Sequence, residues 1–413
     1  MKGDNKKLIE NFLSLLSVQA TNYILPLITV PYLVRILEPE KFGLISFAQA
    51  FIQYFVLITD YGFNLSATRE ISISRENKNK ISTIFSAVLI IKLYLMLLCF
   101  FILNLIVFNV KKFKNEWFVY NFMFGIVVGN VLFPIWFFQG MEKMKLQAFL
   151  NLITKVIFTI GIFVIIKEQS DYIYVPVIYS VCYIILGLSS ILIIFLSFKV
   201  RFKYPSLSII KHELIEGSYI FLSTIAISIY TISNTFILGV FTEEKYVGYY
   251  AAGEKIIRAF QYLLIPISQT LYPHINKLAV ESKREALVLI KKILKIVGII
   301  MFCISLTLFV FASKISKLIL GNKYSESVYV IKILAFLPFV VSLSNILGIQ
   351  TMITFGFKKE FTKILIIASV ISIIISLFLV HPLKHIGISI SSLIAEIFVT
   401  VSMFIFLKKE NYL

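Results

Sequence analysis

The chain has 413 residues, of which 59% are hydrophobic and only 15% are charged, and its mean hydropathy is +0.90. A soluble domain carries about a quarter charged residues, so this composition excludes a soluble globular protein. The formal net charge is +18, but the basic residues lie in short segments between hydrophobic runs. With no sizeable polar domain, this charge indicates membrane topology and contact with anionic lipid headgroups, and it argues against nucleic-acid binding.

Twelve hydrophobic runs divide the chain, each close to the length of about 20 residues that a helix needs to cross a bilayer. Continuous runs such as residues 364–379 lack the alternation of barrel strands, so we predict an all-α polytopic membrane protein. The first run follows a basic start that resembles a secretory signal, but it is too long and has no small-residue cleavage pattern. In chain order, the predicted spans are residues 9–34, 42–63, 82–109, 117–139, 147–166, 173–198, 215–240, 248–272, 291–312, 328–355, 361–380 and 386–407.

The distribution of lysine and arginine orients these spans. If the N-terminus is cytoplasmic, and if two inside segments are counted to residues 295 and 363 so that they include the basic residues at the adjoining span ends, the inside segments hold 24 of the 40 Lys and Arg residues. The outside segments then hold 11, and five lie within spans. Short cytoplasmic loops are enriched in basic residues, so both termini are predicted to be cytoplasmic.

Two similar stretches indicate an internal repeat. Glu-Lys-Phe-Gly at 40–43 and Glu-Lys-Tyr-Val-Gly at 244–248 both follow a long span and a short outside loop, and their offset of 204–205 residues is about half of the chain. Two halves of six spans have the same topology, and parallel repeats of this kind build transporters with a substrate site between the halves. We therefore predict an N-terminal six-helix bundle at 1–198, a cytoplasmic linker at 199–214 and a C-terminal six-helix bundle at 215–413.

The predicted span 248–272 holds the most informative polar cluster, Glu254, Lys255, Arg258, Gln261 and Gln269. Arg258 lies near the middle of this span, where a charged residue costs about 2.5–3.5 kcal/mol unless it faces a wet cavity or a partner. Glu254 and Arg258 are four residues apart and share a helix face. Either this pair neutralises itself while Lys255 extends to the interface, or the shared face lines a central cavity.

Other charged residues also lie within spans, and they leave similar alternatives open. Lys92 can extend to the interface, pair with an acid or line the cavity, whereas Glu396 can be a paired structural residue or a proton-coupling one. The four lysines and one arginine within spans outweigh Glu254 and Glu396 by about three charges. This excess suits an anionic substrate, because a bare pyrophosphate would cost tens of kcal/mol to move through hydrocarbon without a hydrated basic path.

The remaining reactive residue types form no recognisable constellation. Cys99, Cys182 and Cys303 all lie in hydrophobic runs, which is typical of packing residues, and the four histidines are scattered near helix ends. The longest outside segment, residues 313–327, holds a single acid, Glu326. We predict no catalytic residue, no metal ligand and no cofactor, and we expect that the protein is not an enzyme.

The opening of the chain carries motifs that resemble those of a known family. They are Asn11-Phe12-Leu13-Ser14-Leu15, Gln19, Asn22-Tyr23, Pro26-Leu27, Pro31-Tyr32-Leu33-Val34-Arg35-Ile36-Leu37, Pro39-Glu40 and Phe42-Gly43, and then Asp60-Tyr61-Gly62-Phe63-Asn64-Leu65-Ser66-Ala67-Thr68-Arg69-Glu70. In these motifs the chain resembles the Wzx-type O-antigen flippases, in the polysaccharide transporter branch of the MOP exporter superfamily, whose relatives are MATE and MurJ-type exporters. The motifs cover only about the first 75 residues, and the C-terminal half resembles the family mainly by architecture, whereas the length, the twelve spans and the two halves agree over the whole chain.

The resemblance implies a V-shaped protein of two bundles in the bacterial inner membrane. Such a protein moves an undecaprenyl-pyrophosphate-linked oligosaccharide from the cytoplasmic to the periplasmic leaflet for lipopolysaccharide O-antigen biosynthesis, without covalent chemistry. It also implies coupling to an ion or proton gradient, contact with membrane lipids, and an O-antigen polymerase and a chain-length regulator as partners. The candidate substrate-binding cations are Arg258, Lys255, Lys92 and Arg35, although Arg35 could equally be a structural anchor, and Glu254 and Glu396 are candidate structural or coupling acids.

Two other classes of protein remain open. A MATE-like multidrug exporter or another lipid exporter would share the fold, but a cationic substrate usually needs a buried acid in the first bundle, and residues 11–34 hold none. An O-antigen polymerase or a membrane transferase would need catalytic acids, histidines or an arginine-rich outside loop at the bilayer edge, and the sequence shows no constellation of this kind.

Overall fold

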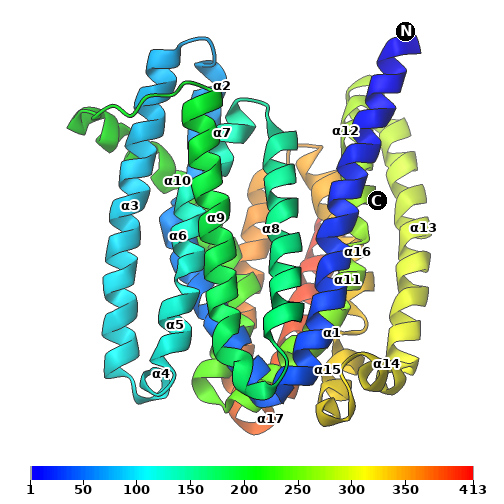
Figure 1. Ribbon diagram of the computed structural model, residues 1–413. Helices are drawn as coiled ribbons and strands as arrows, with labels where there is room; N and C mark the ends of the chain where they lie inside the picture. Colours follow the sequence, from blue (N-terminus) through cyan, green and yellow to red (C-terminus); the bar gives the residue numbers. More distant parts are fainter. Residues whose placement is uncertain (1, 413) are drawn as a thin grey trace. The chain divides into compact units, whose positions relative to one another are not determined.

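A computed structural model describes the backbone of residues 2–412, and their side chains except those of residues 2–24, 27, 219–220, 222–231, 266 and 269–270. All regular structure in this part of the chain is helical (Figure 1). The chain divides into two compact units, Met1–Leu37 with Ala48–Ile225 and Glu38–Phe47 with Ala226–Leu413. Because these units are defined by packing and not by repeat, the predicted bundles 1–198 and 215–413 with their linker 199–214 remain a prediction.

The first unit is built from the helices of the N-terminal half. Two helices, α1 and α10, contribute to both units, since the unit boundaries fall within them. In chain order the helices are α1 (Lys2–Asp60), α2 (Phe63–Ile73), α3 (Lys78–Asn109), α4 (Lys111–Lys114), α5 (Trp117–Met123), α6 (Gly125–Leu132), α7 (Ile135–Gly140), α8 (Met144–Ile165), the 3₁₀ turn η1 (Gln169–Ile173), α9 (Tyr174–Ser197) and α10 (Leu207–Phe241).

Packing within the first unit buries a cluster of large aromatic side chains and leaves other hydrophobic side chains exposed. Helix α9 packs against α6 and α8, while α2 packs against α7. A buried cluster joins Phe63 of α2, Phe85 of α3 and the consecutive Trp136 and Phe137 of α7. Large hydrophobic side chains such as Phe101 remain exposed along α3 and α8, as expected of helix faces in contact with lipid.

Two long helices contain sharp breaks instead of the predicted loops. Helix α1 is interrupted only at Glu38, whose φ of 59° and ψ of 173° are not helical. Pro39 follows directly, and proline disfavours the helical conformation in the residue before it. The last helix, α17 (Lys358–Lys409), breaks in the same way at Lys384, two residues after Pro382. The outside loops predicted at 35–41 and 381–385 are therefore breaks of a single residue in continuous helical chain.

The second unit begins its own series of helices after α10. These are α11 (Glu244–Gln261), α12 (Leu264–Glu281), α13 (Lys283–Val310), α14 (Ala312–Ile319), the 3₁₀ turn η2 (Asn322–Tyr324), α15 (Ser327–Leu334), α16 (Leu337–Asn345), the π-helix η3 (Ile346–Ile353) and α17. Helix α11 packs against α15, α16 and α17, so its polar residues lie inside the unit.

The two stretches that suggested an internal repeat lie in direct contact within the second unit. A Cβ added to Gly43 would lie 1.8 Å from the backbone oxygen of Glu244, and one added to Gly248 would lie 1.9 Å from that of Pro39. Each glycine thus meets the carbonyl of the residue about one helical turn before the other glycine. Only glycine allows backbones to approach this closely, which explains why both stretches contain one.

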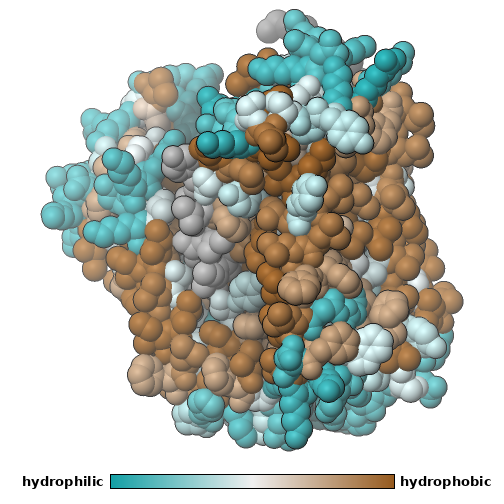
Figure 2. Space-filling view, turned by 90° about the vertical axis from the view of Figure 1, so that its left-hand side faces the viewer, coloured by the Kyte–Doolittle hydropathy of each residue, from teal (hydrophilic) through white to brown (hydrophobic). Residues whose placement is uncertain are grey.

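The helices confirm the prediction of a polytopic all-α membrane protein. Within the described residues, eight helices are long and apolar enough to cross a membrane. Of these, Lys358–Lys409 combines two predicted spans, and Ile28–Ile73 combines the predicted span 42–63 with the end of the span 9–34. The predicted spans at 215–240 and 248–272 are helical as well, as α10, α11 and α12. On the face shown in Figure 2, hydrophobic side chains fill a broad middle band and hydrophilic side chains gather at the upper and lower ends.

Candidate functional site

A polar pocket in the second unit contains most of the cluster that the sequence singled out. Glu254, Arg258 and Gln261 recur at intervals of three and four residues along α11, so they share one helix face. This face lines a cavity of about 150 Å³ together with Glu396 of α17. The structure thereby brings together Arg258 and the two candidate acids, which the sequence placed 142 residues apart at most.

The strongest interaction in this pocket is the ion pair predicted from the spacing along α11. Nη2 of Arg258 donates to Oε1 of Glu254 at 2.8 Å, and the two side chains are 41% and 18% exposed. A guanidinium has five N–H donors, so one bond to Glu254 leaves donors for a second oxygen anion. The pair is therefore both a local neutralisation and a possible binding group, and the two interpretations from the sequence are compatible.

A chain of hydroxyl and amide groups extends from this ion pair into the interior of the unit. The hydroxyl of Tyr250 donates to Oε1 of Glu254 at 3.4 Å and lies 3.2 Å from Oγ of Ser392. Nδ2 of Asn234 donates to the same Ser392 oxygen at 2.8 Å, and Oγ of Ser376 donates to Oδ1 of Asn234 at 3.1 Å. These bonds fix α10, α11 and α17 to one another, so they hold the Glu254 carboxylate in a defined position.

The second acid of the pocket, Glu396, is held by hydrogen bonds with α16. Oγ of Ser344, the penultimate residue of α16, donates to Oε1 of Glu396 at 2.8 Å. Oγ1 of Thr400 donates to the backbone oxygens of Glu396 and Val340, which ties this turn of α17 to α16. The π-helix η3 begins two residues after Ser344, and such helices are frequent at functional sites.

The charge of the pocket differs from the predicted excess of cations. Its charged lining residues are one arginine and two glutamates. The other candidate cation of α11, Lys255, places its Nζ 4.8 Å from the ring centroid of Phe42, in a cation–π contact, and does not line this pocket. The cations that the sequence summed over all spans thus have separate environments, because neighbouring helix positions point in different directions.

The two remaining candidate cations belong to the first unit. Lys92 is only 2% exposed, and its Nζ donates to Oδ1 of Asp60 at 2.9 Å. This pairing was one of the alternatives for Lys92, and it explains how α3 tolerates a buried ammonium group. Arg35 is exposed on α1, three residues before the break at Glu38. Gln269 and the polar residues of the first predicted span up to Asn22 lie outside the described side chains.

Several residues of the pocket were missed by the sequence analysis. Tyr250 lies one turn before Glu254, so its spacing of four residues was a readable signal. Asn234 interrupts a hydrophobic run, which is also a signal. Ser344 and Ser392 gave none, because serine is common in membrane helices and its role depends on which helices pack together.

Comparison with known proteins gives consistent matches over the whole chain. A family model described as "Polysaccharide biosynthesis protein" matches residues 8–279. A protein of Escherichia coli (strain K12) is 35% identical over 414 residues, covering all of both chains, and one of Shigella dysenteriae is 30% identical over 401 residues, covering 95% of this chain and 98% of the relative. Both carry the name "Putative O-antigen transporter".

Solved structures of similar fold come from two groups of transporters. The lipid II flippase MurJ in an inward closed conformation has a TM-score of 0.70 and 14% identity, covering 98% of this chain and 89% of MurJ. An inward-facing multidrug resistance MATE transporter of the MOP superfamily has a TM-score of 0.68 and 14% identity, covering 94% of this chain and 95% of the transporter. At these identities the likeness shows the fold alone.

Proposed function

Because this chain belongs to the polysaccharide biosynthesis protein family, we propose that it is a flippase for a lipid-linked polysaccharide unit. The substrate is an undecaprenyl-pyrophosphate-linked O-antigen repeat unit, which the protein moves from the cytoplasmic to the periplasmic leaflet of the bacterial inner membrane. The observation that carries this proposal is the full-length identity of 35% to a relative named as an O-antigen transporter.

The pocket on α11 supports a transport role without covalent chemistry. Its lining offers hydrogen-bond donors and acceptors, among them Arg258, Gln261 and Asn234, but no histidine, cysteine or lysine. Such a surface suits the hydroxyl groups of a sugar and one anionic group, since a guanidinium binds oxygen anions by charge-assisted hydrogen bonds. We assign Arg258 as the cation that contacts the anionic part of the substrate.

The other candidate cations have different roles in this proposal. Lys92 stabilises the first unit through Asp60, and Lys255 supports the contact between Phe42 and α11. Arg35 stays a candidate for substrate contact, because its side chain is exposed. Glu254 orients Arg258, and Glu396 is a candidate coupling acid.

The test is the surface polysaccharide of a strain that lacks the gene. Expression of this chain in that strain should restore the ladder of O-antigen lengths on a gel, and lipid-linked single units should accumulate in the strain without it. A strain in which single units reach the outer leaflet but stay unpolymerised would instead indicate a polymerase.

A multidrug exporter is the second candidate function, because two carboxylates and one arginine in the pocket also suit an organic cation. Accumulation of a fluorescent cation such as ethidium in cells with and without the chain separates the two functions. The flippase proposal predicts no difference in ethidium accumulation.

A further inference from the structure

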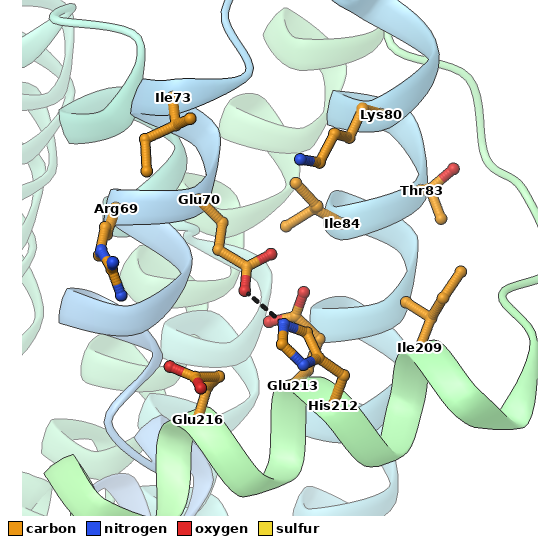
Figure 3. A pocket seen from close by; sticks show the side chains of 10 residues that line it. All are labelled: Arg69, Glu70, Ile73, Lys80, Thr83, Ile84, Ile209, His212, Glu213 and Glu216. Carbon is orange, nitrogen blue, oxygen red and sulfur yellow. Dashed lines mark hydrogen bonds and ion pairs between the residues drawn. The ribbon is translucent and has the colours of Figure 1, made fainter.

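A second polar cavity lies in the first unit, at the start of α10 (Figure 3). Its volume is about 370 Å³, and it is bounded by α2, α3 and α10. Its lining carries charges of both signs, and the ionisable lining residues are Arg69, Glu70, Lys80, His212, Glu213 and Glu216. Residues 199–214 lie outside the predicted spans, so the first two turns of α10, which include His212 and Glu213, lie at the end of the helix next to the loop.

Glu213 is the unusual member of this group. Its side chain is only 1% exposed, and its Oε2 atom is buried without a hydrogen-bond partner. Figure 3 shows its carboxylate directed toward Glu70, whose Oε1 lies 3.1 Å from Nε2 of His212. An ionised carboxylate that is buried without a partner strongly destabilises the folded protein. A bound proton or cation would remove this cost at the Glu213 oxygen.

The charged groups around Glu213 come from all three helices that line the cavity. Helix α2 contributes Arg69 and Glu70, α3 contributes Lys80, and α10 itself contributes His212 and Glu216. Burial raises the pKa of Glu213 most strongly, and the nearby carboxyls of Glu70 and Glu216 raise it further, to about 8. The carboxyl of Glu213 therefore retains its proton at neutral pH while Glu70 accepts from His212.

Glu213 lies near the start of α10, so its proton affects how this end of the helix packs. The unit boundary falls between Ile225 and Ala226, within α10, so the first turns of α10 belong to the first unit and its end to the second. These first turns pack closely, since a Cβ on Gly217 would lie 2.8 Å from the backbone oxygen of Tyr61. The pair of Glu70 and Glu213 therefore lies between α2 and the part of α10 that belongs to the first unit.

We propose that Glu70 and Glu213 hold one proton between them, and that this proton keeps the first turns of α10 docked against α2 and α3. The site is a proton-binding site, and its occupancy makes the attachment of α10 depend on the pH at that side of the membrane. This proton site involves no substrate, so its test does not depend on whether the proposed function is correct.

The direction of this pH dependence follows from proton linkage. The docked state binds the proton up to about pH 8, whereas a solvated glutamate has a pKa near 4.5. The docked state thus binds more protons than the undocked state between these values. Docking is strongest below about pH 4.5, weakens as the pH rises, and levels off above about pH 8.

A proton fits this site better than a metal ion does. Two basic side chains, Arg69 and Lys80, line the same cavity and disfavour a divalent cation. In the part of the chain that the structure describes, no group of three or more His, Cys, Asp and Glu residues is arranged to hold a metal ion. A carboxyl pair needs only one proton to satisfy the buried oxygen, because a protonated carboxyl can donate to the neighbouring carboxylate.

The test is hydrogen exchange of the full-length protein in lipid nanodiscs, followed by mass spectrometry over residues 207–217 from pH 5 to 9. Protection factors, which remove the intrinsic pH effect, should fall in the wild type by tenfold or more as the pH rises and then level off near pH 8. In Glu213→Gln, whose side chain is neutral at every pH, protection should stay high throughout. In Glu70→Gln the fall should end at a lower pH, because one neighbouring negative charge is gone.

Matched variants identify the responsible group. Glu216→Gln removes a glutamate on the same helix that lines the same cavity. Because Glu216 makes a smaller contribution to the raised pKa of Glu213 than Glu70 does, this variant should keep the fall in protection and shift its end to lower pH by less than Glu70→Gln does. If His212→Gln removes the pH dependence while Glu213→Gln retains it, the proposal is overturned in favour of the histidine. If protection follows sodium concentration at constant pH, with choline as the replacement, the site binds a cation and the proton assignment is wrong.

A spectroscopic measurement covers the case in which Glu213→Gln does not fold. Infrared spectra of the wild type should contain the carbonyl band of a buried protonated carboxyl group, and the band should disappear on titration through about pH 8. A spectrum with no such band at neutral pH would contradict the proposal, since both carboxyls would then be ionised.

Discussion

The ion pair of Glu254 and Arg258 is the contact on which the proposed site depends. In many proteins such a pair at four residues' spacing only stabilises a helix, by about 0.2–0.5 kcal/mol. Here Arg258 also lines a cavity together with Glu396. The hydroxyl of Tyr250 donates to the carboxylate of Glu254 and so holds the ion pair in position. The two roles predict different results in a double mutant.

Arg258→Ala should reduce transport by tenfold or more, because it removes a charge-assisted contact to the substrate worth about 1.5–3 kcal/mol. The measurement is the amount of O-antigen ladder per amount of folded protein in the membrane. Glu254→Gln should reduce transport less, since it leaves the guanidinium in the pocket.

The double variant Arg258→Ala with Glu254→Gln separates binding from structure. If the pair only stabilises α11, neutralising both partners should restore transport to near the wild-type level. The proposed site predicts that the double variant stays as inactive as Arg258→Ala, while its thermal stability recovers.

The buried pair of Lys92 and Asp60 is expected to act on stability. Lys92→Met should destabilise the first unit by about 3 kcal/mol, because it leaves the Asp60 carboxylate without its partner. Adding Asp60→Asn should restore most of the loss in melting temperature, measured on detergent-solubilised protein. Normal transport by the stable double variant would confirm a structural role, and its loss would return Lys92 to the substrate path.

The close approach of the helix starts at Gly43 and Gly248 predicts how added side-chain atoms there change stability. Gly43→Ala and Gly248→Ala should each lower stability by about 1–3 kcal/mol, because the added Cβ overlaps a backbone oxygen and must push the two helix starts apart. Since both changes disturb one contact, the double variant should lose less than the sum of the two single losses.

Gly298→Ala is the matched control for this contact. Gly298 also lies in a buried part of a helix, α13, but its added Cβ would have its nearest neighbour at 3.5 Å, an ordinary contact. Its melting temperature should therefore stay close to that of the wild type. An equal loss in all three variants would show that the close approach is unimportant.

Hydrophobic length made most of the helices predictable. Residues 364–379 can only be a helix in hydrocarbon, whereas the break at Glu38 inside a continuous helix was expected as a loop. The partners of charged residues were not predictable in the same way. Asp60 and Lys92 are 32 residues apart, and the sequence shows both charges without showing that their helices meet. For the same reason the sum of all cations within spans overestimated the charge of one pocket.

The molecule as a whole is expected to have both ends at the cytoplasmic side. A green fluorescent protein fused after Leu413 should fluoresce, because it folds only in the cytoplasm, and alkaline phosphatase inserted in residues 313–327 should be active, because it folds only in the periplasm. The reverse pattern for both fusions would contradict the orientation, and with it the direction of transport.

The most direct test of the proposed function locates the lipid-linked unit itself. Spheroplasts of the gene-deleted strain, in a background without the polymerase, should be treated with a periodate-based label that cannot cross the membrane. We predict that expression of the wild-type chain makes the lipid-linked units accessible from outside, and that Arg258→Ala at equal abundance leaves them largely protected. If the units are equally accessible in the strain with and without this chain, then it does not move them across the membrane, and the flippase function is wrong.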